Sequence, residues 1–379
     1  MKKLIYFDNA ATTSVKPEIL DKMIPFFMEK YGNPSAVHTF GMKAKFAIDG
    51  ARQKIASYLN CETDEIYFTS GGSESDNWVI KNTLNLNLKN KHIITTMIEH
   101  PAILNSCAYA EKHGVKITYI RPDGKGIINP QDIKNAITND TVLISVMAAN
   151  NEIGTVEPID EIGKIAHSHG IKFHSDAVQL LGNVDIDLKN SNIDFMSFSA
   201  HKIHGPKGTG ALYIKKGTNI TPFIDGGGQE HQMRSGTENV AGTVGFAFAC
   251  ELLKNEEQKR RVHCKKIRDY FLKKIISQIP DTIVTGDLEN RIPTIASFCF
   301  KNIESNQLLT LLNMSDLAVS AGSACSAGSV KASHVISAIQ VPFEYMHGAL
   351  RVSISDMNTE EEARIATDII INSVKKLRK

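Results

Sequence analysis

The segment TVLISVM (residues 141–147) is followed by IDEIGKIAHSHG (159–170) and then by IKFHS (171–175). The first and last are short β-rich runs, whereas the middle one spaces its apolar residues as a helix does. It ends at Gly170, and glycine is favoured just after a helix C-terminus. A strand, a helix and a second strand in this order predict a right-handed crossover between two parallel strands.

The same alternation extends over residues 17–217. Further strands are expected at 65–69, 92–96, 116–120, 194–199 and 210–214, and further helices at 40–58, 74–84 and 102–112. After Gly226-Gly227-Gly228 we expect helices at 239–277, 304–312, 333–339 and 359–374, and strands at 282–284, 294–300, 318–320 and 350–355. The predicted fold class is α/β, with a large domain (15–257) built on a mostly parallel, doubly wound sheet and a smaller α+β domain (1–14 and 258–379).

Composition excludes several classes of protein. The 42% of hydrophobic and 22% of charged residues are typical of a folded globular chain, which excludes disordered and fibrous architectures. The 43 basic and 41 acidic residues leave a net charge of +2, so no nucleic-acid surface is indicated. The longest apolar stretch (244–253) is too short to span a membrane, and the N-terminus has no signal-peptide core. We expect a soluble, cytoplasmic protein without direct nucleic-acid or membrane partners.

The six cysteines lie far apart, at Cys61, Cys107, Cys250, Cys264, Cys299 and Cys325. None forms a pair at zinc-ligand spacing, so neither a metal site nor a disulfide framework is predicted. Five of them occupy apolar or helical contexts, in which a cysteine is usually a small buried hydrophobe. Cys325 differs because it lies in SAGSACSAGS (320–329), where no side chain is large enough to bury it.

Polar motifs follow three of the predicted strands, at the sheet edge where α/β proteins bind ligands. SGGSE (70–74) opens a helix, so its glycines and free N–H groups suit a phosphate, although an ordinary helix N-cap has the same appearance. Asp176 follows the strand at 171–175, and Lys202 follows the strand at 194–199. A lysine desolvated at a strand end is suited to forming a Schiff base. Asp176 could equally cap a helix and Lys202 could reach solvent, but the three features together favour a pyridoxal 5′-phosphate (PLP) site.

Eight motifs together resemble those of one known family. They are YFDNAATT (6–13), GNPS (32–35), TSGGSESDN (69–77), EH (99–100), NNEIG (150–154), SFSAHKIHGPKG (197–208), RSGT (234–237) and GSAC (322–325). In this order they resemble the cysteine desulfurases of the aminotransferase class V superfamily, nearly from end to end. The resemblance implies the fold type I of PLP-dependent transferases. It also implies the desulfurase group with a long loop around the reactive cysteine.

The resemblance further implies a role for each matching residue. PLP would be bound by Gly72, Ser73, His100, Asn151, Asp176, Gln179, Ser199, His201, Lys202 and Thr237, the last from the second subunit of a homodimer. Asn33 and Arg351 would hold the substrate carboxylate. The catalytic residues would be Lys202, His100 and Cys325. Two of these residues also have a purely structural interpretation: His100 before Pro101 could cap a helix, and Arg351 in ALRVS (349–353) could lie on a surface strand.

The activity implied by the resemblance is removal of sulfur from L-cysteine, giving L-alanine and a persulfide on Cys325. The acceptor would be an iron–sulfur scaffold or a tRNA-thiolation enzyme. Some relatives dock the scaffold through a C-terminal extension. We do not expect this extension here, because the chain stops at Lys379, soon after its last predicted helix. A selenocysteine lyase or another class V enzyme, such as an aminotransferase, is the enzymatic alternative. A sulfur-relay or regulatory platform without catalysis is the other, against which the set of Lys202, Asp176 and His201 argues.

Overall fold

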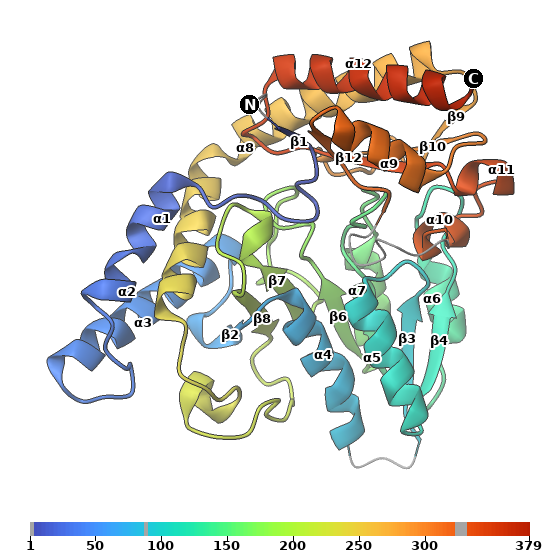
Figure 1. Ribbon diagram of the computed structural model, residues 1–379. Helices are drawn as coiled ribbons and strands as arrows, with labels where there is room; N and C mark the ends of the chain where they lie inside the picture. The colour runs from blue at the N-terminus through green and yellow to red at the C-terminus, as the bar shows by residue number, and fades with distance from the viewer. Residues whose placement is uncertain (1–3, 87–89, 323–331) are drawn as a thin grey trace.

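The computed structural model describes residues 4–86, 90–322 and 332–379. A seven-stranded sheet forms its centre, with strand order β2-β8-β7-β6-β5-β3-β4 (Figure 1). These strands are β2 (Ile66–Thr69), β3 (His92–Thr96), β4 (Lys116–Ile120), β5 (Thr141–Ser145), β6 (Lys172–Asp176), β7 (Phe195–Ser199) and β8 (Gly210–Ile214). All but β8 run in the same direction, so the expected mostly parallel sheet is confirmed.

Strand β8 is antiparallel to both of its neighbours, β2 and β7. The link between β7 and β8 comprises only residues 200–209, whereas a parallel crossover needs a dozen or more residues. The short link therefore forces the chain to turn straight back. Lys202 lies in this link.

Helices cover both faces of the sheet because adjacent strand residues point to opposite sides. On β5, Leu143 packs into a core with α4 (Gly72–Asn82) and α5 (Pro101–Lys112), and the next residue, Ile144, packs into the core on the other face. The second face is covered by α1 (Pro17–Met23), α3 (Thr39–Leu59), α6 (Pro130–Ala136), α7 (Ile159–Ser168) and the first half of α8 (Val240–Gln278). Both faces of the sheet are thus shielded from water, as a parallel sheet requires.

A second, three-stranded antiparallel sheet has the order β12-β10-β9. Its strands are β9 (Thr282–Val284), β10 (Ile295–Phe300) and β12 (Ala349–Ser353), and beside it β1 (Ile5–Tyr6) pairs in parallel with β11 (Leu317–Ala318). The helices around it are α9 (Ser305–Met314), α12 (Glu360–Leu377) and the second half of α8, and α10 (His334–Ala338) and α11 (Phe343–Met346) lie nearby.

Helix α8 belongs to both cores. Phe246 and Leu253 pack against the large sheet, and Cys264 and Phe271 pack against the small one. The predicted change of domain after residue 257 lies between these two pairs, and the domain boundaries as such stay a prediction.

The long periodic elements were predicted correctly to within a few residues, as were the short strand β9 and the short helix α10, whereas five other short elements were missed. The missed elements are β1, α1, α2 (Pro25–Met28), α6 and α11. Three of these helices begin at a proline, which suits the first helical position, but none is long enough to show clear periodicity. The strand predicted at 318–320 ends at Ala318 instead. None of the helices in the described part of the chain has the length and apolar character needed to cross a membrane.

Candidate active site

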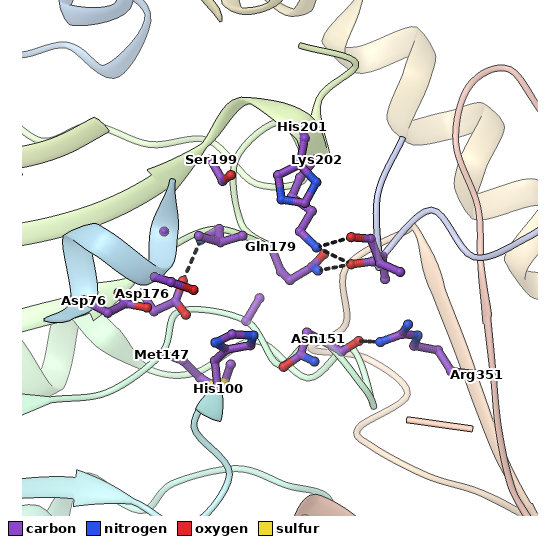
Figure 2. Close-up of a pocket in the computed structure, with 16 residues that line it drawn as sticks. Asp76, His100, Met147, Asn151, Asp176, Gln179, Ser199, His201, Lys202 and Arg351 are labelled. Carbon is purple, nitrogen blue, oxygen red and sulfur yellow. Dashed lines mark hydrogen bonds between the residues drawn. The ribbon is translucent and has the colours of Figure 1, made fainter. Parts of the chain in front are cut away.

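A cavity of about 240 Å³ opens at the carboxyl ends of β6 and β7 (Figure 2). It is lined by ten residues that the sequence singled out: Gly72, Ser73, His100, Asn151, Asp176, Gln179, Ser199, His201, Lys202 and Arg351. It is also lined by Ala10, Ala11, Asp76, Met147, Ala149 and Val178. Residues from separate motifs along the chain therefore meet around one cavity.

Lys202 reaches the cavity from a single 3-10 turn, η3 (Ala200–Lys202), directly after β7. Its Nζ donates hydrogen bonds to the carbonyl oxygens of Ala10 (2.5 Å) and Ala11 (2.9 Å) (Figure 2). Gln179 Nε2 donates to the same Ala10 oxygen at 3.0 Å. The motif YFDNAATT thus forms one wall of the cavity and holds the lysine amine in place.

Carboxyl groups occupy the opposite end of the cavity. Asp176, the last residue of β6, is 5% exposed, and its Oδ1 accepts a hydrogen bond from the Val178 N–H at 2.9 Å. Asp76 of α4 is 1% exposed, and its Oδ1 has no hydrogen-bond partner among the described residues. Burial raises the pKa of both carboxyls, although nearby His100 and Lys202 act to lower that of Asp176. The cavity is therefore polarised, with acids at one end and Lys202 at the other (Figure 2).

His174 supports this acidic end from within the sheet. It is fully buried, and its ring nitrogens lie 2.8 Å from Ser145 Oγ and 3.0 Å from Ser197 Oγ. Burial lowers its pKa to about 3, so the ring is neutral at pH 7. Its Nε2 is 3.7 Å from Asp76 Oδ1.

The N-terminus of α4 faces the cavity without a capping side chain from the described residues. Its N-cap is Gly71, with φ of 152°, so the N–H groups of Gly72 and Ser73 are left to a ligand. Glu74 stabilises the turn that precedes α4, because it accepts hydrogen bonds from the Ser70 N–H (2.9 Å) and from Arg234 Nε (2.7 Å). This geometry suits an anion.

Ser199 lies beside this helix end, where a Cβ at Gly71 would be 3.7 Å from Ser199 Oγ, and His201 lines the same cavity. Ser199 ends β7, and His201 Nδ1 is 3.1 Å from Thr12 Oγ1. Burial, followed by the charges of Lys202 and Lys207, lowers the pKa of His201 to about 4. The neutral ring can therefore donate one N–H to an anion at pH 7.

His100 both caps a helix and lines the cavity. Its Nδ1 accepts a hydrogen bond from the Ala102 N–H at 3.1 Å, at the start of α5. Burial lowers its pKa, with Lys202 and His334 acting in the same direction and Asp176 opposing them. The capping interpretation is thus confirmed without removing His100 from the cavity.

Arg351 is not a surface residue, so that alternative is wrong. It lies on β12, is 2% exposed, and donates hydrogen bonds to Asp8 Oδ1 and to the Asn151 carbonyl oxygen, both at 2.8 Å. It connects the small sheet to the cavity wall.

Two predicted site residues are not in this cavity. Asn33 and Thr237 are exposed and do not line it, and Asn33 Oδ1 instead accepts a hydrogen bond from the Ser35 N–H at 2.9 Å. Cys325 lies outside the described residues. Conversely, our sequence reasoning missed Asp76, although it lies within the quoted motif TSGGSESDN, and it gave no role to Ala10 and Ala11.

The other cysteines are unsuited to nucleophilic chemistry. Four of them are buried and Cys61 is half-buried. Burial raises the pKa of Cys107 to about 12 and that of Cys264 to about 11, which disfavours the reactive thiolate. Within residues 4–86, 90–322 and 332–379 no group of His, Cys, Asp and Glu could hold a metal ion.

Comparisons with known proteins agree with this arrangement. Residues 5–365 match the family Aminotransferase class-V. The chain is 46% identical over 379 residues to cysteine desulfurase IscS of Dictyoglomus turgidum (100% of this chain, 96% of that protein) and 47% identical over 381 residues to cysteine desulfurase IscS of Clostridium botulinum (100% and 96%). A solved structure described as a NifS-like protein superposes with a TM-score of 0.93 at 37% identity, covering 98% of this chain and 100% of that one. This chain therefore belongs to the Aminotransferase class-V family, within its cysteine desulfurase branch.

Proposed function

We propose that this protein is a PLP-dependent cysteine desulfurase that converts L-cysteine to L-alanine and keeps the sulfur as a persulfide on Cys325. One observation carries the proposal: Lys202 and Asp176 lie across one cavity from each other, beside the uncapped N-terminus of α4. The end-to-end match to cysteine desulfurases supports it.

The residues present fit PLP. The α4 N-terminus, Ser199 and the neutral His201 form a donor set suited to a phosphate dianion. The buried Asp176 suits a protonated ring nitrogen, and Gln179 would donate to the phenolic oxygen. When bound, PLP supplies an electron sink that acidifies the Cα proton of an amino acid.

Each step assigned to this chain follows from the position of a side chain. The Lys202 amine would bind the cofactor's aldehyde carbon and, once displaced by the substrate amine, would accept the Cα proton. His100 would lie against the cofactor ring, and Asn151 would contact the cofactor. Arg351 would bind the substrate carboxylate, with Asn33 as a second contact.

Sulfur transfer requires a thiolate, which we assign to Cys325. Its sulfur would attack the sulfur of the bound cysteine, so that an S–S bond forms and the Cβ–S bond breaks. The electron pair of the broken bond stays on Cβ, which takes up a proton and becomes the methyl group of alanine. Cys325 is thereby oxidised to the persulfide level and Cβ is reduced, so no external oxidant is needed. The persulfide sulfur then passes to an acceptor, for which we propose an iron–sulfur scaffold or a tRNA-thiolation enzyme in the cytoplasm.

We further propose that the enzyme is a homodimer in which Thr237 completes the phosphate site of the other subunit. Two observations support this. Thr237 is exposed and outside its own cavity. Large apolar side chains of α1–α3 and of the segments beside them are also exposed, namely Leu20, Ile24, Phe27, Met28, Tyr31, Val37, Phe40, Met42 and Phe46, and such a patch marks an interaction surface.

The test of the proposed function is the substitution Cys325→Ala. The variant should still bind PLP and L-cysteine, because the cavity residues are intact, but alanine formation from L-cysteine should fall about a hundredfold or more once the nucleophile is absent. Cys107→Ala, which removes a buried thiol, should stay within about threefold of wild type. Undiminished turnover by Cys325→Ala would instead favour a lyase such as a selenocysteine lyase, and wild-type transamination without sulfide release would favour an aminotransferase.

A further inference from the structure

Glu152 is a buried glutamate of the motif NNEIG to which the proposed reaction gives no role. It is 2% exposed, and its Oε1 has no hydrogen-bond partner among the described residues. Its Oε2 accepts a hydrogen bond from Ser333 Oγ at 2.5 Å. A buried carboxylate with so few partners is costly, so its presence calls for a role.

The ends of the segment that carries Cys325 meet at this carboxylate. Gly322 and Ser333 lie on either side of residues 323–332 in the sequence, yet a Cβ at Gly322 would be 3.5 Å from Ser333 Cβ. The same Cβ would be 2.8 Å from Glu152 Oε2, so Gly322 packs directly against the carboxylate. Glu152 therefore contacts Gly322 and Ser333, which flank the segment that carries Cys325.

The backbone that presents Glu152 is fixed to the wall of the cavity. Asn150 Oδ1 accepts hydrogen bonds from the N–H groups of Glu152 (2.8 Å) and Ile153 (3.0 Å), which holds the turn in place. The neighbouring residue, Asn151, lines the cavity, and its carbonyl oxygen accepts the hydrogen bond from Arg351. The loop ends are thus anchored one residue away from the proposed substrate site.

We propose that Glu152 is a positioning residue that holds both ends of the Cys325 segment, at Gly322 and Ser333, against the wall of the active site. Fixing the two ends confines the segment to the neighbourhood of the cavity, which raises the effective concentration of the Cys325 thiol at the substrate sulfur. Glu152 acts on sulfur transfer and not on Cα deprotonation, which is assigned to Lys202. The inference rests on the proposed desulfurase function.

The experiment measures these two steps separately on the full-length, PLP-loaded enzyme. Exchange of the Cα proton of L-alanine in D2O, followed by NMR, reports on Lys202 without involving Cys325. Single-turnover persulfide formation from L-cysteine, followed by alkylation and mass spectrometry, reports on Cys325. Glu152→Ala should slow persulfide formation about tenfold or more while Cα exchange stays within about threefold of wild type.

Glu157→Ala is the matched control. Glu157 is also buried, at 3% exposure, on the same segment, and one of its oxygens likewise has no described partner. Its other oxygen accepts a hydrogen bond from the Ile128 N–H at 2.8 Å, whereas the oxygen of Glu152 accepts from Ser333. Both rates should therefore stay within about threefold of wild type in this variant.

Substitutions at Ser333 test the same contact from the other end, and they apply even if Glu152→Ala yields little folded protein. The Ser333 side chain also caps α10 by accepting from the Val335 N–H, and both Asp and Asn can keep this cap. Ser333→Asn retains a donor for Glu152, whereas Ser333→Asp places a second carboxylate against it. Persulfide formation should therefore be at least about fivefold slower in Ser333→Asp than in Ser333→Asn.

The outcomes separate this inference from the proposed function. A wild-type enzyme that exchanges Cα protons but forms no persulfide contradicts the proposed function itself. With an active wild type, the role of Glu152 is overturned if Glu152→Ala slows both steps equally, or slows neither, or if the two Ser333 variants behave alike.

Discussion

Glu99 is a fully buried glutamate. Its neighbour in the sequence is His100, which caps α5 and lines the cavity. Glu99 is 0% exposed, and its Oε1 accepts hydrogen bonds from Thr96 Oγ1 (2.7 Å) and from the Met147 N–H (2.9 Å). Its Oε2 has no hydrogen-bond partner within the described residues. Burial is the main cause that raises its pKa to about 8 from an ordinary value of 4.5.

This raised pKa makes stability depend on pH. The unfolded chain loses the Glu99 proton near pH 4.5, whereas the folded protein keeps it up to about pH 8. The free energy of unfolding should therefore fall as pH rises through this window, by up to about 1.4 kcal/mol per pH unit from this group. Glu99→Gln, which is neutral and of the same shape, should lose that component. Urea unfolding of the wild type and of Glu99→Gln at pH 5, 6.5 and 8 measures this component. Parallel pH profiles of the unfolding free energy for the two proteins would contradict the prediction.

Lys202 is the residue whose loss should be visible without any assay of turnover. Lys202→Ala removes the amine that would bind the cofactor aldehyde, so the visible absorption band of the protein-bound cofactor should disappear from the purified protein. Lys216→Ala, which removes a surface amine paired with Asp64 at 2.8 Å, should keep the band at wild-type intensity. A wild-type protein that stays colourless after incubation with PLP would contradict the cofactor assignment.

At the scale of elements, the close fit of α4 against the 176–179 turn fixes the anion site. A Cβ at Gly72 would lie 2.5 Å from Val178 Cγ2, so Gly72→Ala must displace either the helix end or the Val178 side chain, and both line the cavity. PLP affinity, measured by spectroscopic titration, should fall about tenfold or more in this variant. Gly50→Ala on α3 is the control, because no atom lies within 4 Å of the added methyl. Gly50→Ala should keep the wild-type affinity for PLP and raise the free energy of unfolding by about 0.5–1 kcal/mol. Equal PLP affinities in Gly72→Ala and Gly50→Ala would contradict the assigned anion site.

The sequence was most informative where a local pattern decides the structure. Strand ends place Asp176 and Lys202 at one edge of the sheet, and SGGSE indicates the helix end that faces them, so most of the cavity could be predicted. Contacts between distant segments could not be predicted in this way. Ala10 and Ala11 reach Lys202 through long-range contacts of their segment, such as the pairing of β1 with β11 and the hydrogen bond from the Ala10 N–H to Ser353 Oγ, and no local periodicity indicates these contacts. The burial of Arg351 likewise depends on Asp8, far away in the chain.

At the scale of the whole molecule, the proposed sharing of Thr237 between subunits can be tested with mixed dimers. Lys202→Ala and Thr237→Ala homodimers should each bind PLP poorly. In a hybrid of the two, one site would receive Lys202 from one subunit and Thr237 from the other, so half of the sites should regain wild-type affinity. Equilibrium titration of tag-purified hybrids measures this fraction. If no site recovers, Thr237 acts within its own subunit. If the Thr237→Ala homodimer binds PLP as the wild type does, Thr237 has no role in binding.

Helix α8 has a further consequence for how the protein moves and unfolds. Its 39 residues form one continuous helix that is anchored in both cores, and residues 254–263 between the anchors are held by the helix's own hydrogen bonds. A hinge between the two sheets would have to break several of those bonds, so large rigid-body opening is disfavoured and substrate entry must rely on smaller segments. The same continuity couples the two cores energetically, because unfolding one of them frays the helix that stabilises the other. We therefore expect heat to melt the subunit in a single calorimetric step and not core by core.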